Sequence, residues 1–247
     1  MKDRIKKVIP LRLRSPLRSV YHHMRHALES VFRFRVCAIY RRFQGFTMIP
    51  RDIYTANLRL TQRMYDIPGD VVECGVWRGG MSGGMATLLG GARRYWLFDS
   101  FEGLPAPDER DGADALRYHH DEGSPHFNDN CRADKAIADE AMARSGASDV
   151  CVIKGWFNDT LPNFPMDRRI AVLRLDGDWY GSVMCCLRNL YPRVVQGGLI
   201  IIDDYYYWDG ASRAVHDFLS EISSADRVSQ FDNQVAYILK GAAPARR

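Results

Sequence analysis

Four aspartates follow two largely apolar stretches of the chain, and their grouping is suited to binding a divalent cation. Asp176 and Asp178 come directly after one apolar run, and the adjacent pair Asp203 and Asp204 comes directly after the next. Carboxylates that share one site repel each other unless a cation neutralises them. Magnesium prefers such hard oxygen ligands, together with water and substrate oxygens. We therefore predict a metal site at these acids.

A metal held by these acids would act on a hydroxyl group. A bound divalent cation is a Lewis acid that lowers the pKa of a hydroxyl in contact with it, which yields an alkoxide-like nucleophile near neutral pH. A carboxylate oxygen of Asp178 is then suited to accept the proton as a general base.

A glycine-rich turn, Glu73-Cys-Gly75-Val-Trp-Arg-Gly79-Gly80, is expected to approach a cofactor. Glycine permits positive φ and lets the backbone come close to a ligand. A glutamate at the start of the turn would repel a pyrophosphate, but it suits the ammonium and sulfonium groups of S-adenosylmethionine. Asp99 ends the next predicted strand, where acids accept hydrogen bonds from ribose hydroxyls. That chemistry is shared by NAD and S-adenosylmethionine sites, so Asp99 does not separate them.

Aromatic side chains follow a third predicted strand. Trp156 and Phe157 are suited to form a wall for an adenine ring and to attract a sulfonium by cation–π interaction. They are equally suited to be ordinary core residues.

Each of these patterns also has an explanation without a ligand. The aspartates would then cap following helices or pair with Arg174, Arg188 and Arg213. The glycines would serve only helix–strand packing, and Asp99 would be a helix cap. Two adjacent aspartates after four apolar residues are unusual for capping alone, which favours the metal site.

The elements that must position these residues alternate along the chain. The predicted strands are residues 71–74, 95–98, 150–153, 170–175, 199–202 and 234–239. The predicted helices are residues 54–67, 81–89, 131–144, 182–191 and 212–222. Near-continuous β-branched runs separated by helices predict a doubly wound, mostly parallel α/β sheet covered on both faces. Ligands bind beyond the carboxyl ends of such strands, and acids end four of them here.

Residues 103–130, rich in Pro, Gly, Asp and His, are predicted to form a long loop. Loops of this length in a compact domain are usually lids or substrate-binding elements, and that is the expected role. His119, His120 and His126 are expected to be solvated rather than metal-bound.

The chain of 247 residues is long enough for one α/β domain and an N-terminal extension. Residues 1–51 carry a net charge of +11 and the remainder −7. We predict a basic helical extension over residues 1–50 and the domain over residues 51–247. The extension would pack on the acidic domain or a second subunit, or bind an anionic membrane surface; nucleic acid is the least favoured partner.

Composition excludes several other classes. No apolar run approaches the roughly 20 residues needed to span a bilayer, and the basic N-terminus does not resemble a secretory signal. A cytoplasmic protein is expected. The six cysteines show no CxxC spacing, so neither a disulfide framework nor a zinc site is predicted.

Six motifs occur in an order that resembles the macrocin O-methyltransferase family: ECGVWRGG, LFDSFEGLP, KGWFNDTLP, LRLDGDWY, LYPRVVQGGLIIIDDY and AVHDF. The resemblance covers roughly residues 47–238. It implies a class I, Rossmann-like methyltransferase fold, S-adenosylmethionine as donor, Mg²⁺ dependence and a homo-oligomer. The family methylates sugar hydroxyls of macrolide and aminocoumarin antibiotics.

The resemblance also implies roles for individual residues. Its cofactor-binding residues would be Glu73, Gly75, Gly79, Asp99, Ser100 and Trp156. The first two would contact the methionine part, Asp99 the ribose and Trp156 the adenine.

The metal ligands implied by the resemblance are Asp176, Asp203 and Asp204. The catalytic base would be Asp178 or Asp176. We prefer Asp178, because a metal-bound carboxylate is a poorer proton acceptor.

This chain departs from the family pattern after Tyr180, where Gly181-Ser182-Val183 replaces the usual acid, Ser and Thr. No family motif covers the basic residues 1–45. The acceptor is therefore not restricted to the antibiotic sugars of the family, and a sugar hydroxyl on another glycoside or on a bacterial surface glycan is equally consistent with the sequence.

Two other function classes fit the sequence less well. An NAD-dependent oxidoreductase would need a GxGxxG turn, which ECGVWRGG does not match, and would leave Asp203 and Asp204 unexplained. A non-catalytic module that binds through the basic arm would lose salt-sensitive binding when residues 1–45 are deleted.

Overall fold

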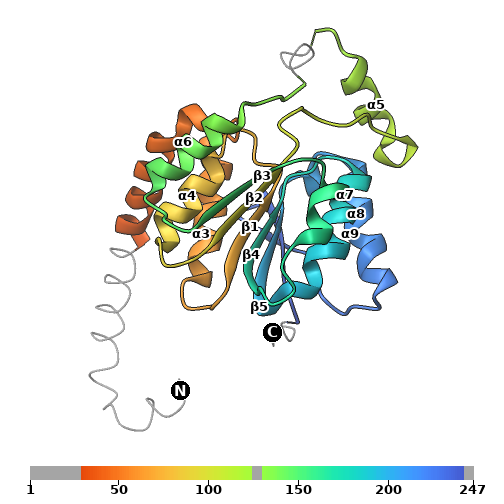
Figure 1. Ribbon diagram of the computed structural model, residues 1–247. Helices are drawn as coiled ribbons and strands as arrows, with labels where there is room; N and C mark the ends of the chain where they lie inside the picture. The colour runs from red at the N-terminus through yellow and green to blue at the C-terminus, as the bar shows by residue number, and fades with distance from the viewer. Residues whose placement is uncertain (1–28, 124–129, 242–247) are drawn as a thin grey trace, which may run out of the picture.

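A single twisted sheet forms the centre of the molecule (Figure 1). The structure is a computed structural model that describes residues 29–123 and 130–241. Its strands are β1 (Asp70–Cys74), β2 (Tyr95–Asp99), β3 (Val150–Lys154), β4 (Ile170–Leu175), β5 (Val194–Ile202), β6 (Ser229–Phe231) and β7 (Val235–Leu239). They lie in the order β3-β2-β1-β4-β5-β7-β6. The first five are parallel, and β7 is antiparallel to both of its neighbours. The predicted doubly wound, mostly parallel sheet is thus confirmed.

Helices cover both faces of the sheet (Figure 1). One face carries α3 (Arg51–Thr61), α4 (Gly80–Leu89) and α6 (Lys135–Ser145), and the other carries α7 (Phe157–Thr160), α8 (Tyr180–Leu190) and α9 (Asp209–Glu221). The helix α5 (Gly112–His120) lies apart from both layers, in the connection that follows β2. The 3-10 turns are Gln44–Phe46, Gln62–Met64, Glu109–Asp111, Leu161–Asn163, Tyr191–Arg193 and Asp203–Tyr206.

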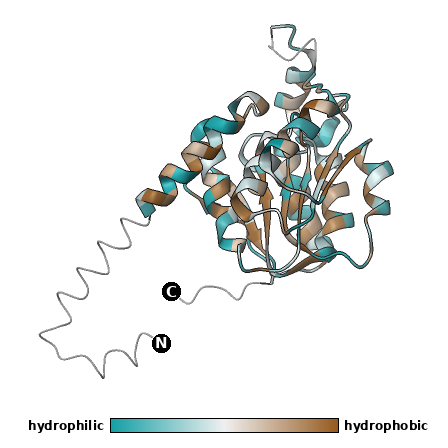
Figure 2. Ribbon diagram, turned by 60° about the vertical axis from the view of Figure 1, so that its left-hand side comes forward, coloured by the Kyte–Doolittle hydropathy of each residue, from teal (hydrophilic) through white to brown (hydrophobic). Residues whose placement is uncertain are grey.

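Successive strand residues feed two separate cores, one under each helical layer. Val172 and Leu199 pack with the α3–α4–α6 layer, whereas Leu173 and Ile200 pack with the α8–α9 layer. Side chains alternate between the faces of a strand, so a sheet covered on both sides needs apolar residues at nearly every position. The strands are accordingly the most hydrophobic part of the chain (Figure 2).

The described part of the basic extension packs on the domain. Residues 29–43 are helical. Val36, Ile39 and Phe43 from this helix are buried in the core of the α3–α4–α6 layer. Residues 1–28 lie outside the described part of the chain, so the boundary at residue 50 stays a prediction.

The structure corrects the expected loop over residues 103–130. It contains the 3-10 turn Glu109–Asp111 and the helix α5. Among the described side chains of α5 only Ala115 is fully buried, and the helix is short, so few core positions mark it in the sequence.

Strand β5 is longer than predicted, because Gly197 and Gly198 lie inside it rather than before it. Gly197 has a φ of +74°, and the β4–β5 pairing shifts register nearby, which is typical of a bulge. The short strand β6 and the single-turn helix α7 were not predicted. Within residues 29–123 and 130–241, no helix has the length and apolarity needed to cross a bilayer.

Candidate active site

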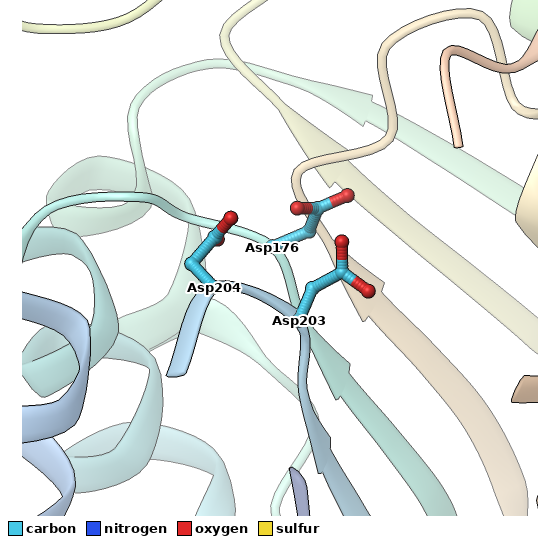
Figure 3. A group of neighbouring side chains, drawn as sticks. All are labelled: Asp176, Asp203 and Asp204. Atoms are coloured by element: carbon cyan, nitrogen blue, oxygen red, sulfur yellow. The ribbon is translucent and has the colours of Figure 1, made fainter. Parts of the chain in front are cut away.

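Three of the four aspartates meet at the carboxyl ends of β4 and β5 (Figure 3). Asp176 follows β4, and Asp203 and Asp204 begin the 3-10 turn after β5. One carboxylate oxygen from each of the three lies within 4.8 Å of the others. β4 and β5 are adjacent and parallel, so their ends bring residues separated by more than 25 positions into one group. No other group with metal-ligand character occurs in the described residues.

A buried arginine lies directly beneath the aspartates. The Arg174 side chain is fully buried on β4. Its Nη1 is 2.7 Å from Asp176 Oδ2 and 2.6 Å from Glu73 Oε1, and its Nη2 is 2.5 Å from Asp203 Oδ1. The ion-pair alternative is thus realised for Arg174, whereas Arg188 pairs with Glu221 on the surface. One guanidinium cannot neutralise all these carboxylates, and no cation among the described residues pairs with Asp204.

Asp203 and Asp204 hold their protons more tightly than usual. Burial raises the pKa of Asp203 to about 6, with a further rise from the Asp176 charge and an opposing effect of Arg174. Burial and the charge of Asp178 raise the pKa of Asp204 as well. Burial is the larger cause of both shifts, and the repulsion among neighbouring carboxylates adds to it; a divalent cation would neutralise that repulsion.

Asp178 lies beside the three aspartates rather than among them. Its φ of +55° turns the chain after β4, and its backbone N–H donates to Asp204 Oδ2 at 3.0 Å. Its Oδ1 accepts a hydrogen bond from Trp208 Nε1 at 3.1 Å. Burial, followed by the charge of Asp176, raises the pKa of Asp178 to about 7. This carboxylate is therefore close to the pKa that suits a general base at neutral pH.

A cleft of about 550 Å³ opens beside the aspartates. The predicted cofactor residues that line it are Gly75, Asp99, Ser100 and Trp156, together with Asp176 from the predicted metal site. The structure thus brings these four cofactor residues and Asp176 to one cavity, whereas Asp203 and Asp204 do not line it. Trp156 is 39% exposed and is therefore not an ordinary core residue.

Asp99 holds the glycine-rich turn in place. Its carboxylate accepts hydrogen bonds from the backbone N–H of Val76 and Trp77, at 2.6 and 2.8 Å, and from that of Phe101 at 2.6 Å. Since a carboxylate has about four acceptor positions, it retains capacity for a ribose hydroxyl.

Glu73 and Gly79 do not line this cleft. Glu73 is 1% exposed and is bonded to the Ser82 hydroxyl and Arg174. Gly79 has a φ of +78°, and a Cβ placed on it would lie 3.0 Å from the backbone of Ala138 in α6. Direct contact of these two residues with the cofactor stays a prediction.

Two residues that the sequence did not single out attach the segment before α5 to the site. Asp111 is 2% exposed and accepts hydrogen bonds from the backbone N–H of Tyr180, at 2.6 Å, and of Asp108, at 2.7 Å. Trp179 donates from Nε1 to the carbonyl oxygen of Pro105 at 2.8 Å, and its ring contacts Trp208. Asp111 lies in a polar stretch of sequence that shows no pattern, so nothing indicated its role. Trp179 lies within the motif LDGDWY, and its place beside Asp176 and Asp178 was the one signal that it is near the site.

The histidines of this segment contribute no metal ligand among the described residues. His119 lies in α5. The His120 side chain and His126 lie outside what the structure describes, so their predicted solvation stays a prediction.

Known proteins resemble the chain over most of its length. Residues 24–240 match the macrocin O-methyltransferase family. The chain is 40% identical over 186 residues to 8-demethyl-8-(2,3-dimethoxy-alpha-L-rhamnosyl)-tetracenomycin-C 4'-O-methyltransferase of Streptomyces olivaceus, which covers 73% of this chain and 69% of that protein. It is 36% identical over 184 residues to demethyldecarbamoylnovobiocin O-methyltransferase of Streptomyces niveus, covering 70% and 66%.

A solved structure shares the fold. The structure of the O-methyltransferase NovP superimposes with a TM-score of 0.65 and 30% sequence identity, over 80% of this chain and 83% of that one. The architecture described above is therefore that of an O-methyltransferase.

Proposed function

The chain belongs to the macrocin O-methyltransferase family, and we propose that it methylates a sugar hydroxyl of a glycosylated natural product or glycan at a carboxylate-bound Mg²⁺. It is an O-methyltransferase that uses S-adenosylmethionine as methyl donor. The observation that carries the proposal is the meeting of Asp176, Asp203 and Asp204 beside the cleft lined by Gly75 and Asp99.

The proposed acceptor follows from the relatives. The name of the Streptomyces olivaceus relative specifies a rhamnosyl group methylated at the 4' oxygen. Sugar hydroxyls are weak nucleophiles at neutral pH, so an enzyme that methylates them needs a means of activating the oxygen.

The residues present fit a magnesium ion. Asp176, Asp203 and Asp204 offer one oxygen each within 4.8 Å, which matches the few carboxylates that Mg²⁺ uses beside water and substrate oxygens. When bound, the cation supplies Lewis-acid activation of the acceptor hydroxyl.

We propose that Asp178 takes the proton of that hydroxyl. Trp208 holds its Oδ1 by a hydrogen bond and so fixes the orientation of the carboxylate. The acceptor oxygen then bonds to the methyl carbon, the carbon–sulfur bond of S-adenosylmethionine breaks, and S-adenosylhomocysteine leaves with the bonding electrons. Trp179 and Asp111 hold the segment that precedes α5 against the cleft. This segment limits the access of water to the reacting groups.

The basic extension is proposed to contact a second copy of the chain. Val31 and Phe34 on the helix of residues 29–43 are 69% and 70% exposed, although the opposite side of this helix is buried in the core. An anionic membrane surface is the alternative partner. Sedimentation velocity, and co-sedimentation with anionic vesicles at low and high salt, separate the two. A cytoplasmic location stays a proposal.

The function is tested by methyl transfer from labelled S-adenosylmethionine to a panel of rhamnosides and other glycosides. We expect labelled product that disappears with a chelator and returns with Mg²⁺, and that is lost in Asp204→Asn but not in Asp139→Asn, which changes a surface acid paired with Lys135. Activity that is unaffected by the chelator would remove the metal from the proposal while leaving the methyl transfer intact.

A further inference from the structure

We propose that Arg174 is a positioning residue that makes Asp176 and Asp203 present one oxygen each to the metal, so that the site favours Mg²⁺ over Ca²⁺. This inference rests on the proposed metal site. It concerns a residue outside the ligand group and the cleft lining.

Arg174 lies where the sheet would otherwise be apolar. It is on the central strand β4, paired in register with Glu73 of β1 on one side and Ile201 of β5 on the other. Its Nε and Nη2 make no hydrogen bond among the described residues, and Nη2 contacts Asp203 only as an ion pair. A buried guanidinium with an unpaired N–H is unfavourable for folding by itself. Its contacts with three carboxylates therefore point to a role at the site.

Each proposed ligand has one oxygen engaged by a protein donor. Arg174 Nη1 binds Asp176 Oδ2, and Nη2 contacts Asp203 Oδ1 as an ion pair. The backbone N–H of Asp178 binds Asp204 Oδ2. The second oxygen of each aspartate accepts no N–H from the described residues, and the three side chains point toward one another (Figure 3).

This arrangement restricts how the carboxylates coordinate a cation. A guanidinium at 2.5 to 2.7 Å from a carboxylate oxygen occupies one acceptor direction of that oxygen and places a positive charge beside it, which disfavours bidentate binding of a cation by the same carboxylate. Mg²⁺ demands a compact octahedron, whereas Ca²⁺ takes six to eight ligands and readily uses bidentate carboxylates. A site limited to monodentate aspartates therefore disfavours Ca²⁺.

Glu73, on the neighbouring strand β1, fixes the position of the Arg174 guanidinium. Its Oε1 lies 2.6 Å from Arg174 Nη1, and the Ser82 hydroxyl donates to its other oxygen. It thereby holds the guanidinium in the orientation that reaches both aspartates. This explains why Glu73 is buried beneath the cleft rather than exposed in it.

The test is calorimetric titration of Mg²⁺, Mn²⁺ and Ca²⁺ into the full chain saturated with S-adenosylhomocysteine. The wild type should bind Mg²⁺ and Mn²⁺ at least about 10-fold more tightly than Ca²⁺. Arg174→Lys keeps the charge but cannot span both aspartates, so Mg²⁺ affinity should fall about 10-fold or more, as is typical when residues supporting metal ligands are changed. Ca²⁺ affinity should fall less, which lowers the selectivity. Arg188→Lys, at a surface ion pair, should leave both affinities unchanged.

The outcomes separate this inference from the metal proposal. Equal binding of Ca²⁺ and Mg²⁺ by the wild type, or unchanged selectivity in a folded Arg174→Lys, contradicts the role of Arg174 while leaving a metal site. Absence of divalent-cation binding by the wild type contradicts the metal site itself. If Arg174→Lys fails to bind S-adenosylhomocysteine, the test uses Glu73→Gln instead, which removes one hydrogen-bond partner of the guanidinium. Its selectivity for Mg²⁺ over Ca²⁺ should be lower than that of the wild type, and an unchanged selectivity contradicts the role of Arg174.

Discussion

Proton affinity and metal affinity are linked at the residues of this site. The pKa of Asp203 is raised to about 6 and that of Asp178 to about 7, from an ordinary value of 3.8, mainly because burial disfavours their charged forms. The folded, metal-free chain therefore binds more protons than the unfolded chain between about pH 4 and pH 7.

The first prediction follows from this linkage. As pH rises from about 4 to 7, the metal-free fold should lose stability, because buried acids must give up protons that they hold more tightly than the unfolded chain does, while Mg²⁺ affinity should rise, because the cation binds the deprotonated acids. Thermal melts with and without Mg²⁺ should diverge with increasing pH. Melting curves that keep the same separation from about pH 5 to pH 8 would contradict it.

A second prediction separates base from ligand. Asp178→Asn should lower kcat by about 100-fold or more, the usual effect of losing a general base, and should leave Mg²⁺ and S-adenosylhomocysteine affinities nearly unchanged. Asp176→Asn should weaken Mg²⁺ binding instead. If Asp178→Asn retains its kcat, the assignment of the base fails.

The sequence predicted the grouping of the aspartates better than the contacts of the residues that hold them in place. Asp176, Asp203 and Asp204 were found because carboxylates after apolar runs must meet where parallel strands end. Arg174 was considered only as an alternative partner, since nothing in a linear pattern shows that one guanidinium reaches two neighbouring strands. Glu73 was expected at the cofactor because strand-end position does not reveal on which side of the turn a side chain lies.

At the scale of elements, the turn after β1 depends on one glycine. Gly75 has a φ of +84°, and a Cβ on it would lie 1.7 Å from the carbonyl oxygen of Asp176. The ends of β1 and β4 can therefore approach this closely only with glycine here.

A third prediction concerns this contact. Gly75→Ala should destabilise the fold by roughly 2–4 kcal/mol through overpacking and backbone strain, and should weaken both S-adenosylhomocysteine and Mg²⁺ binding because Asp176 must move. Gly45→Ala, where a Cβ meets nothing within 4 Å, is the control for the loss of a glycine. Equal chemical-denaturation midpoints for the two variants would contradict the account of this turn.

Elements were predictable where burial imposes a pattern. The parallel strands and the helices that cover them carry apolar periodicity, and most were found close to their observed bounds. The helix α5 lies outside the packed layers, and Ala115 is its one fully buried residue among the described side chains, so few core positions distinguish its sequence from a loop. The bulge at Gly197 interrupts β5 and made the strand look shorter than it is.

At the scale of the whole molecule, the strand order places the functional residues together at the carboxyl ends of the central strands. β1 and β4 are neighbours in the centre of the sheet, and the direction of crossover connections reverses between them. Ligands bind at such a switch point, beyond the carboxyl ends of the strands. The alternation of strands and helices predicted this end of the sheet, whereas no sequence pattern showed where the basic extension and α5 would pack.

The central claim is that a divalent cation and the cofactor share this end of the sheet. The most direct measurement is calorimetric titration of S-adenosylhomocysteine and Mg²⁺ into the wild type and Asp204→Asn. We predict that both bind the wild type, and that the variant retains S-adenosylhomocysteine affinity but loses Mg²⁺ affinity by at least about 10-fold. Identical Mg²⁺ titrations for the two proteins, or no Mg²⁺ binding by either, would contradict the account.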